Sequence, residues 1–173
     1  MQGKATVAGH PIHPILVTFP IGCFVAAVVC DIVSIWAGVA FWAAMSTALI
    51  GFGIAGTLIA GFFGFVDYLS APMSAAAKSV GAWHLTVMVC VAIVFGVAFA
   101  LRVGAHATPA GYVLTVAGAV LLVVGGTLGG SLAHRHLVGS AESDRREPRN
   151  ANDEAALTPE ERIVRSREIN RRV

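Results

Sequence analysis

Four long apolar stretches restrict the fold of this chain more than any other feature of its sequence. Each has about 20 or more mostly apolar residues, the length that a helix needs to cross the hydrocarbon core of a bilayer. The whole chain agrees, with 56% hydrophobic and 13% charged residues and a mean hydropathy of +0.75. Such a composition is not that of a soluble domain. The sequence therefore predicts an all-α integral membrane protein with spans at about 14–38, 41–69, 82–103 and 111–133.

Short links join these stretches, so neighbouring helices are expected to run antiparallel and to form an up-down four-helix bundle. Residues 1–138 then form one transmembrane domain with both ends on one side of the bilayer. Residues 139–173 have too few apolar side chains for a core and are expected to form a charged tail, disordered to partly helical. Within the tail, Thr158, Pro159 and Glu161 form a capping-box pattern that predicts a short helix reaching toward Arg171.

Positive charges near the span ends differ between the two sides of the predicted bundle. Lys4, Lys78 and Arg135 lie on the side of the termini, together with the arginines of the tail, whereas Arg102 lies on the opposite side. The positive-inside rule therefore predicts that both termini are cytoplasmic. Arginines and carboxylates alternate in the tail, so a nucleic-acid-binding surface is not expected.

A motif of two histidines and two prolines, Gly9-His10-Pro11-Ile12-His13-Pro14, stands directly before the first apolar stretch. A proline disfavours the helical conformation of the residue before it, which predicts that His10 and His13 lie on an extended or turning segment. The helix is then expected to begin near Pro14. Pro20 cannot donate a hydrogen bond to the Leu16 carbonyl, so a kink or a break is expected in the first span.

Small residues recur at four-residue steps in the second and fourth spans. Gly53, Thr57 and Gly61 form one such row, and Gly125 and Gly129 belong to another. This spacing lets helices approach closely, and packing within the bundle is the interpretation that we favour. The same rows also permit a homo-oligomer, and the glycines could instead make room for a flat cofactor.

Alternating helix direction brings several ionisable residues to the cytoplasmic end of the bundle. His10 and His13 precede the first span, Asp67 closes the second and His84 opens the third. Two further histidines, His134 and His136, close the fourth span. At the opposite end, Asp31 and Arg102 are expected to form a structural ion pair at the membrane interface, because an ionisable residue near a bilayer usually finds a partner.

The residue types in the cytoplasmic cluster indicate ligation rather than hydrolysis, since no serine or cysteine nucleophile accompanies a histidine. His10, His13, Asp67 and His84 could bind a transition metal, with Asp67 as a ligand or as the partner of an imidazole. Alternatively, His13 and His84 could be the two axial ligands of haem b. Met88 lies one helical turn after His84 and could add a thioether or simply pack.

A role without any cofactor also fits these residues. Polar groups at helix ends often hydrogen-bond to one another or to free backbone carbonyls, which would stabilise the bundle by itself. For His10, His134 and His136 this interpretation is the preferred one, because interfacial histidines are common. His13, Asp67 and His84 stay candidates for either role.

Several motifs occur together in this chain: the motif at 9–14, Phe19-Pro20-Ile21-Gly22, Gly64-Phe65-Val66-Asp67-Tyr68, His84 and Gly129-Gly130-Ser131-Leu132. Together they resemble a known bacterial membrane family, domain of unknown function 2231. The resemblance covers about residues 7–140 and implies a compact four-helix protein of the bacterial cytoplasmic (inner) membrane. Some members are joined to, or encoded near, redox modules, although the family has no established activity. Its fourth span usually ends differently, with an aromatic residue where His134 stands.

Two functions of different classes follow from this reading. In the first, a small redox-associated protein binds haem b or a metal through His13 and His84, with Asp67 in support, and exchanges electrons with a respiratory partner protein or the quinone pool. In the second, a cofactor-free scaffold or accessory subunit recruits a partner through its tail. A stand-alone enzyme is not expected. Transport has less support, because the spans lack paired interruptions and midplane charges.

Overall fold

The computed structural model describes residues 6–7, 10–71, 73–105, 107–134 and 158–163, and it is an all-α bundle as predicted. Four helical segments in this part of the chain are long and apolar enough to cross a membrane, the first being formed by α1 and α2 together. Helix bounds lie within a few residues of the expected spans at most ends. The helices are α1 (Ile12–Leu16), α2 (Thr18–Ala37), α3 (Ala40–Ser70), α4 (Ala75–Arg102) and α5 (Pro109–His134).

The third span begins earlier than the sequence predicts. Helix α4 begins at Ala75 rather than near residue 82, because the side chain of Ser74 caps it. The Ser74 hydroxyl oxygen accepts a hydrogen bond from the Ala77 N–H at 3.2 Å and so satisfies one of the free donors of the first turn. Its first turns carry the exposed Lys78, so hydropathy alone did not assign them to the span.

The segment before the first span is extended at one histidine and helical at the other. Strands β1 (Thr6–Val7) and β2 (His10–Pro11) pair antiparallel, with Val7 opposite His10. The prediction of an extended conformation was wrong for His13, which lies in the first turn of α1. Pro14 is tolerated there because the first turn of a helix does not use its N–H groups as donors within the helix.

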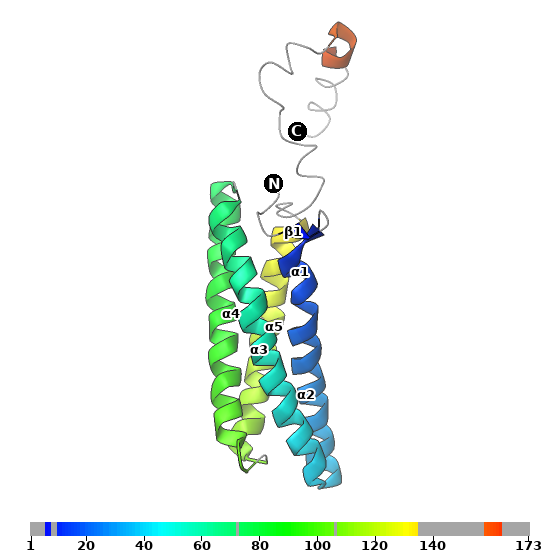
Figure 1. Ribbon diagram of the computed structural model, residues 1–173, viewed down its shortest axis with the longest axis vertical. Helices are drawn as coiled ribbons and strands as arrows, with labels where there is room; N and C mark the ends of the chain where they lie inside the picture. Colours follow the sequence, from blue (N-terminus) through cyan, green and yellow to red (C-terminus); the bar gives the residue numbers. More distant parts are fainter. Residues whose placement is uncertain (1–5, 8–9, 72, 106, 135–157, 164–173) are drawn as a thin grey trace.

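The interruption expected from Pro20 separates α1 from α2 at Val17. The Val17 N–H donates to the His13 carbonyl at 3.1 Å, and the Ile21 N–H donates to the Val17 carbonyl at 3.2 Å. Between these two bonds, Pro20 has no N–H to offer the Leu16 carbonyl. The Val17 backbone itself stays helical, with φ −65° and ψ −21°, so the interruption is confined to this hydrogen bond. Helix α1 carries His13 at the end of the bundle (Figure 1).

Four transmembrane segments alternate in direction and enclose one common axis (Figure 1). Helices α2 and α3 form one closely packed hairpin, and α4 and α5 form a second. Contacts between α3 and α4 and between α2 and α5 close the ring. The beginning of α1, the end of α3, the beginning of α4 and the end of α5 consequently lie at the same end of the bundle, as the up-down topology requires.

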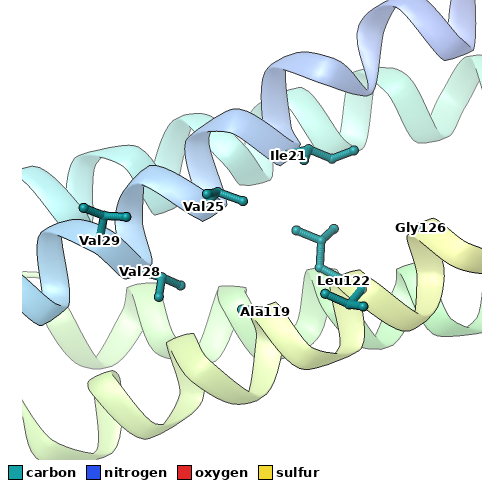
Figure 2. Close-up of a pocket in the computed structure, with 8 residues that line it drawn as sticks. Ile21, Val25, Val28, Val29, Ala119, Leu122 and Gly126 are labelled. Atoms are coloured by element: carbon teal, nitrogen blue, oxygen red, sulfur yellow. The ribbon is translucent and has the colours of Figure 1, made fainter.

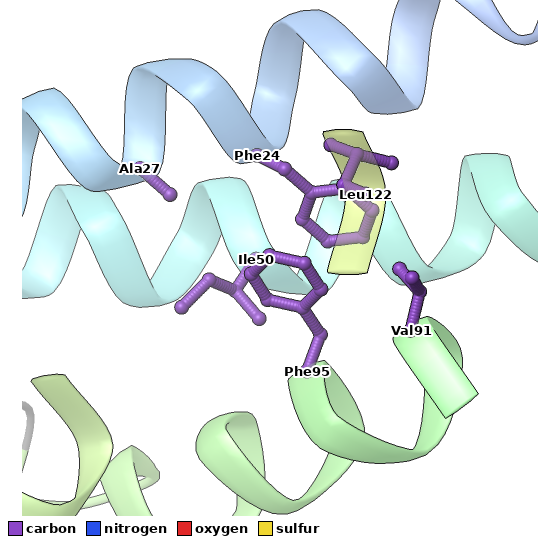
Figure 3. Packing of buried hydrophobic residues seen from close by; sticks show 6 residues of the cluster. All are labelled: Phe24, Ala27, Ile50, Val91, Phe95 and Leu122. Atoms are coloured by element: carbon purple, nitrogen blue, oxygen red, sulfur yellow. The ribbon is translucent and has the colours of Figure 1, made fainter. Parts of the chain in front are cut away.

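The centre of the core is a stacked pair of phenylalanines, one from each hairpin (Figure 3). The rings of Phe24 and Phe95 are 3.8 Å apart between centroids and only 10° from parallel, and both are fully buried. Each ring lies against a glycine of its own hairpin. A Cβ atom on Gly53 would come within 2.5 Å of Phe24, and one on Gly118 within 2.8 Å of Phe95. These glycines thus make room for side chains of the core.

The outer surface of the bundle is apolar, as contact with a lipid bilayer requires. Large exposed hydrophobic residues occur on every long helix, for example Ile32, Leu58, Ile93 and Val123. In water such a surface would be far larger than the apolar patches of soluble monomers. In a bilayer it lies against lipid tails, so it involves no exposure of apolar groups to water.

In the tail, the structure describes a helical stretch at residues 159–163. Its capping box is formed: the Thr158 N–H donates to the Glu161 carboxylate at 2.9 Å, and the Glu161 N–H donates to the Thr158 hydroxyl at 3.4 Å. The expected continuation toward Arg171 lies outside the described residues.

Candidate histidine site

One ring nitrogen of His13 forms a hydrogen bond to the second helix of its own hairpin. Its Nδ1 lies 2.7 Å from the carbonyl oxygen of Ala60 in α3, and because a carbonyl only accepts, Nδ1 is the donor. One helical turn further along α3, Gly64 leaves the space that the ring fills. A Cβ atom there would lie 2.7 Å from Nδ1. The imidazole is therefore fixed in tautomer and in orientation.

His84 is held in the same way in the second hairpin. Its Nδ1 donates to the carbonyl oxygen of Gly125 in α5 at 2.9 Å. Gly129, one turn further along α5, makes room for the ring, since a Cβ atom there would lie 3.0 Å from the ring carbon Cε1. Gly64 and Gly129 therefore make room for the two imidazole rings.

The two imidazoles meet across the axis of the bundle. Their centroids are 6.4 Å apart and their planes are 81° from parallel. Because each Nδ1 carries the proton that it donates, each neutral ring has its lone pair on Nε2, the nitrogen on the far side from the carbonyl. Among the described residues, neither Nε2 has a hydrogen-bond partner. Each ring of the pair therefore keeps one acceptor nitrogen without a partner among the described residues.

The histidine pair is one of three matched layers along this axis. Asp31 and Arg102 are 71 residues apart in sequence. The same interval separates His13 from His84, and Phe24 from Phe95. In each layer the two side chains meet, as a ring contact or as an ion pair. The hairpins are therefore two repeats of one design, related by an approximate two-fold axis along the bundle.

The second helices of the two repeats also correspond, at an interval of 65 residues. The hydrogen-bond acceptors, Ala60 and Gly125, are equivalent, and so are Gly64 and Gly129 beside the histidine rings. Sequence reasoning did not detect this repeat. The signal is present, because a histidine, a phenylalanine and a charged residue occur at the same spacing in the first and third spans, but few other positions are identical.

At the other end of the bundle, Asp31 and Arg102 form a doubly hydrogen-bonded ion pair. Arg102 Nη1 donates to Asp31 Oδ1 at 2.7 Å, and Nη2 donates to Oδ2 at 2.6 Å. The predicted ion pair is formed, and it lies inside the bundle, since Arg102 is fully buried and Asp31 is 4% exposed. The pair faces the interior because α2 and α4 turn these residues toward the axis, where the two charges meet. Among the described residues, the buried Nε of Arg102 has no hydrogen-bond partner.

Side chains from the remaining helices complete this ion-pair layer. Ser46 of α3 accepts a further hydrogen bond from Arg102 Nη1 at 2.9 Å. Tyr112 of α5 places its ring 4.8 Å from the guanidinium carbon, and its hydroxyl lies 3.2 Å from the hydroxyl of Ser34. The layer therefore joins all four spans. Nothing in the sequence pattern singled out Ser34, Ser46 or Tyr112.

The other residues expected near the histidines are only partly placed. Asp67 is half-buried in the last turn of α3, and His134 is exposed at the end of α5. For His10 the structure describes the backbone alone, and His136 lies outside the described residues. Within the described parts of the chain, no three His, Cys, Asp or Glu side chains gather as a metal site. His13 and His84 are therefore the two predicted site residues that the structure brings together.

An open pocket of about 370 Å³ lies between α2 and α5 (Figure 2). Gly126 at its edge follows Gly125, whose carbonyl accepts the His84 hydrogen bond. All the lining residues are aliphatic or glycine, among them Ile21, Val25 and Leu122. None of them could coordinate a metal ion or a haem iron.

Four apolar helices, arranged as two repeated hairpins around buried polar layers, define an integral membrane protein. The chain belongs to the family described as predicted membrane protein (DUF2231), whose family model matches residues 9–142. This match confirms the resemblance noted from the sequence. Comparison with curated proteins and with solved structures gives no match.

Proposed function

We propose that this protein binds a redox cofactor, haem b or a transition metal ion, between His13 and His84. One observation carries the proposal: both imidazoles are anchored through Nδ1–H to backbone carbonyls, their rings lie 6.4 Å apart, and within the described parts of the chain Nε2 of each ring has no hydrogen-bond partner. Metal-bound histidines show this pattern, because the hydrogen bond at one nitrogen orients the ring and raises the basicity of the other.

The two cofactors use the same ligands in different ways. Haem iron takes one imidazole on each face of the macrocycle, and its redox potential depends on those ligands and on burial. A metal ion requires additional donors, for which His10 and Asp67 are the nearest candidates in the sequence, Asp67 as a ligand or as a hydrogen-bond partner. In either case the bound group exchanges electrons with a respiratory partner protein or with the quinone pool.

The side of the membrane determines which partners can reach the site. Lys78 lies in the first turns of α4, close in sequence to His84. Its charge, together with the charged tail, supports a bacterial inner-membrane location with both termini in the cytoplasm. Reporter fusions after Gly38 and at the C-terminus test this orientation. Activity of a cytoplasmic reporter at Gly38 would reverse it.

An optical spectrum of the detergent-purified protein, oxidised and dithionite-reduced, tests the cofactor together with metal analysis. We expect either a Soret band with sharp reduced α and β bands or a stoichiometric metal. His13→Ala and His84→Ala should each remove the signal, whereas His134→Ala, a change at an exposed histidine of the same bundle end, should preserve it. Retention of the signal in both single variants would refute the ligand assignment.

A second candidate function is a cofactor-free scaffold whose tail recruits a cytosolic partner. The formed capping box at Thr158 and Glu161 favours it, because a capped helical stretch in a charged tail is a ready docking element. Deletion of the chain after Gly139 should then abolish recovery of the partner and leave the bundle folded. Unchanged recovery would count against the scaffold.

A further inference from the structure

The two repeats differ at one point beside the histidine site. In the first repeat the helical turn after His13 carries Val17, and the acceptor of its hydrogen bond is Ala60. In the second repeat the corresponding residues are Met88 and Gly125. The asymmetry is therefore a paired change, a larger side chain on one helix and a smaller one on its neighbour.

The paired change places a thioether next to the His84 anchor. A Cβ atom on Gly125 would lie 2.7 Å from Met88 Sδ, so an alanine at this position, as in the first repeat, would displace the sulfur. Met88 also lies one helical turn after His84, on the same helix face. Its flexible side chain lets the sulfur adjust toward the axis without movement of the backbone.

We infer that the site takes a single copper ion, held by Nε2 of His13, Nε2 of His84 and Sδ of Met88. The inference rests on the proposed function, whose two histidines it retains, and it specifies the metal. Imidazole suits zinc, copper, iron and nickel, whereas a thioether favours soft Cu(I). Copper is the metal that both kinds of donor share.

The location of the site suits a soft cation of low charge. Within the described residues no three His, Cys, Asp or Glu side chains gather as a metal site, and the three donors named here, two imidazoles and a thioether, are all neutral. Neutral ligands leave the charge of the ion uncompensated, and this penalty is smaller for monovalent Cu(I) than for a divalent ion. The neutral donors therefore favour Cu(I) because of its low charge, and the thioether favours it because both are soft.

Competition with a chromophoric Cu(I) chelator tests the inference on the full-length protein in detergent, under anaerobic reducing conditions. The parallel titration uses Zn²⁺ with its own indicator. The variants are His13→Ala, His84→Ala and Met88→Leu, a nearly isosteric change. Met45→Leu in α3 is the matched control, because Met45 lies in the second turn of α3, at the opposite end of the bundle from the histidines.

We expect one Cu(I) per chain, and loss of binding in both histidine variants. Met88→Leu should weaken the affinity for Cu(I) by at least the roughly 10- to 100-fold that is typical of a lost supporting partner. The affinity for Zn²⁺ should stay within about twofold of that of the unaltered protein. Met45→Leu should bind as the unaltered protein does. A Cu(I) affinity unchanged by Met88→Leu overturns the thioether ligand. Zinc binding tighter than copper overturns the choice of metal.

The same experiment separates this inference from the function on which it rests. If the purified protein carries haem that depends on His13 and His84 and binds no copper, the copper site is refuted and the proposed function stands. If neither haem nor any metal depends on the two histidines, both are refuted. Folding of each variant is checked by its elution as a single species and by its helical circular dichroism.

Discussion

Asp31 and Arg102 occupy equivalent positions in two repeated hairpins, yet they carry opposite charges and bind each other through two hydrogen bonds of 2.7 and 2.6 Å. Two identical hairpins would bring like charges together at this layer of the axis. Opposite charges make the two hairpins complementary. The ion pair therefore favours packing of the first hairpin against the second over packing of two like hairpins. Ser46 from α3 and Tyr112 from α5 extend the pair to the remaining helices.

Removal of one partner of this ion pair should destabilise the bundle strongly. Arg102→Met leaves a buried carboxylate without its cation and should lower the free energy of unfolding by about 3–5 kcal/mol. The double variant Asp31→Leu with Arg102→Met removes both charges and should be more stable than Arg102→Met alone. Titration of mixed micelles with sodium dodecyl sulfate, followed by circular dichroism, measures both. Equal stabilities of the single and the double variant would contradict this account.

The glycines beside the histidine rings offer a test with controls from the same helices. Gly64→Ala and Gly129→Ala place a Cβ atom 2.7 Å from His13 Nδ1 and 3.0 Å from His84 Cε1, so each should displace a ring and weaken cofactor binding. Gly61→Ala and Gly130→Ala meet no atom within 4 Å. These two should leave binding unchanged, and each could stabilise its helix by up to about 1 kcal/mol.

Ligand affinity and thermal unfolding, measured on all four glycine variants, complete this test. The expected order places both control variants at or above the unaltered protein and both ring-side variants below it. A ring-side variant with full affinity would show that the imidazole can shift without loss of the site.

The stacked phenylalanines should contribute similarly from the two repeats. Phe24→Ala and Phe95→Ala each delete a fully buried ring and should cost about 3–5 kcal/mol of unfolding free energy. Each ring is the other's main neighbour across the axis, so the double variant should lose less than the sum of the two. A double-mutant cycle on detergent-solubilised protein measures the coupling. Strict additivity would mean that the stack itself contributes nothing.

The tail helix should depend on pH through Glu161. Hydrogen bonds from the Thr158 N–H and hydroxyl hold the pKa of the Glu161 carboxyl below its ordinary value of 4.5. A lowered folded-state pKa stabilises the helix above the unfolded value and ceases to do so as pH falls through the folded one. The helical stretch should therefore be fully capped at pH 7 and lost in acid. Carbon NMR of labelled Glu161 measures this titration, and Thr158→Ala should raise the pKa toward 4.5.

The sequence by itself determined the class of the protein and the number and order of its spans. Length and apolarity are properties of one segment at a time, and each of the four stretches meets the requirement of the bilayer without reference to the others. The break near Pro20 and the capping box at Thr158 are local in the same sense, because neighbouring residues alone produce them. Alternating direction also sufficed to bring His13 and His84 to one end.

Only the tertiary structure decided which side chains meet. The partners of His13 and His84 are backbone carbonyls of other helices, and Asp31 and Arg102 are buried between the helices. These contacts depend on how far each helix is rotated about its own axis, a variable that apolar spans lined by small residues leave open. Packing of the phenylalanine rings into the glycine gaps sets that rotation, and the histidine and ion-pair layers follow from it.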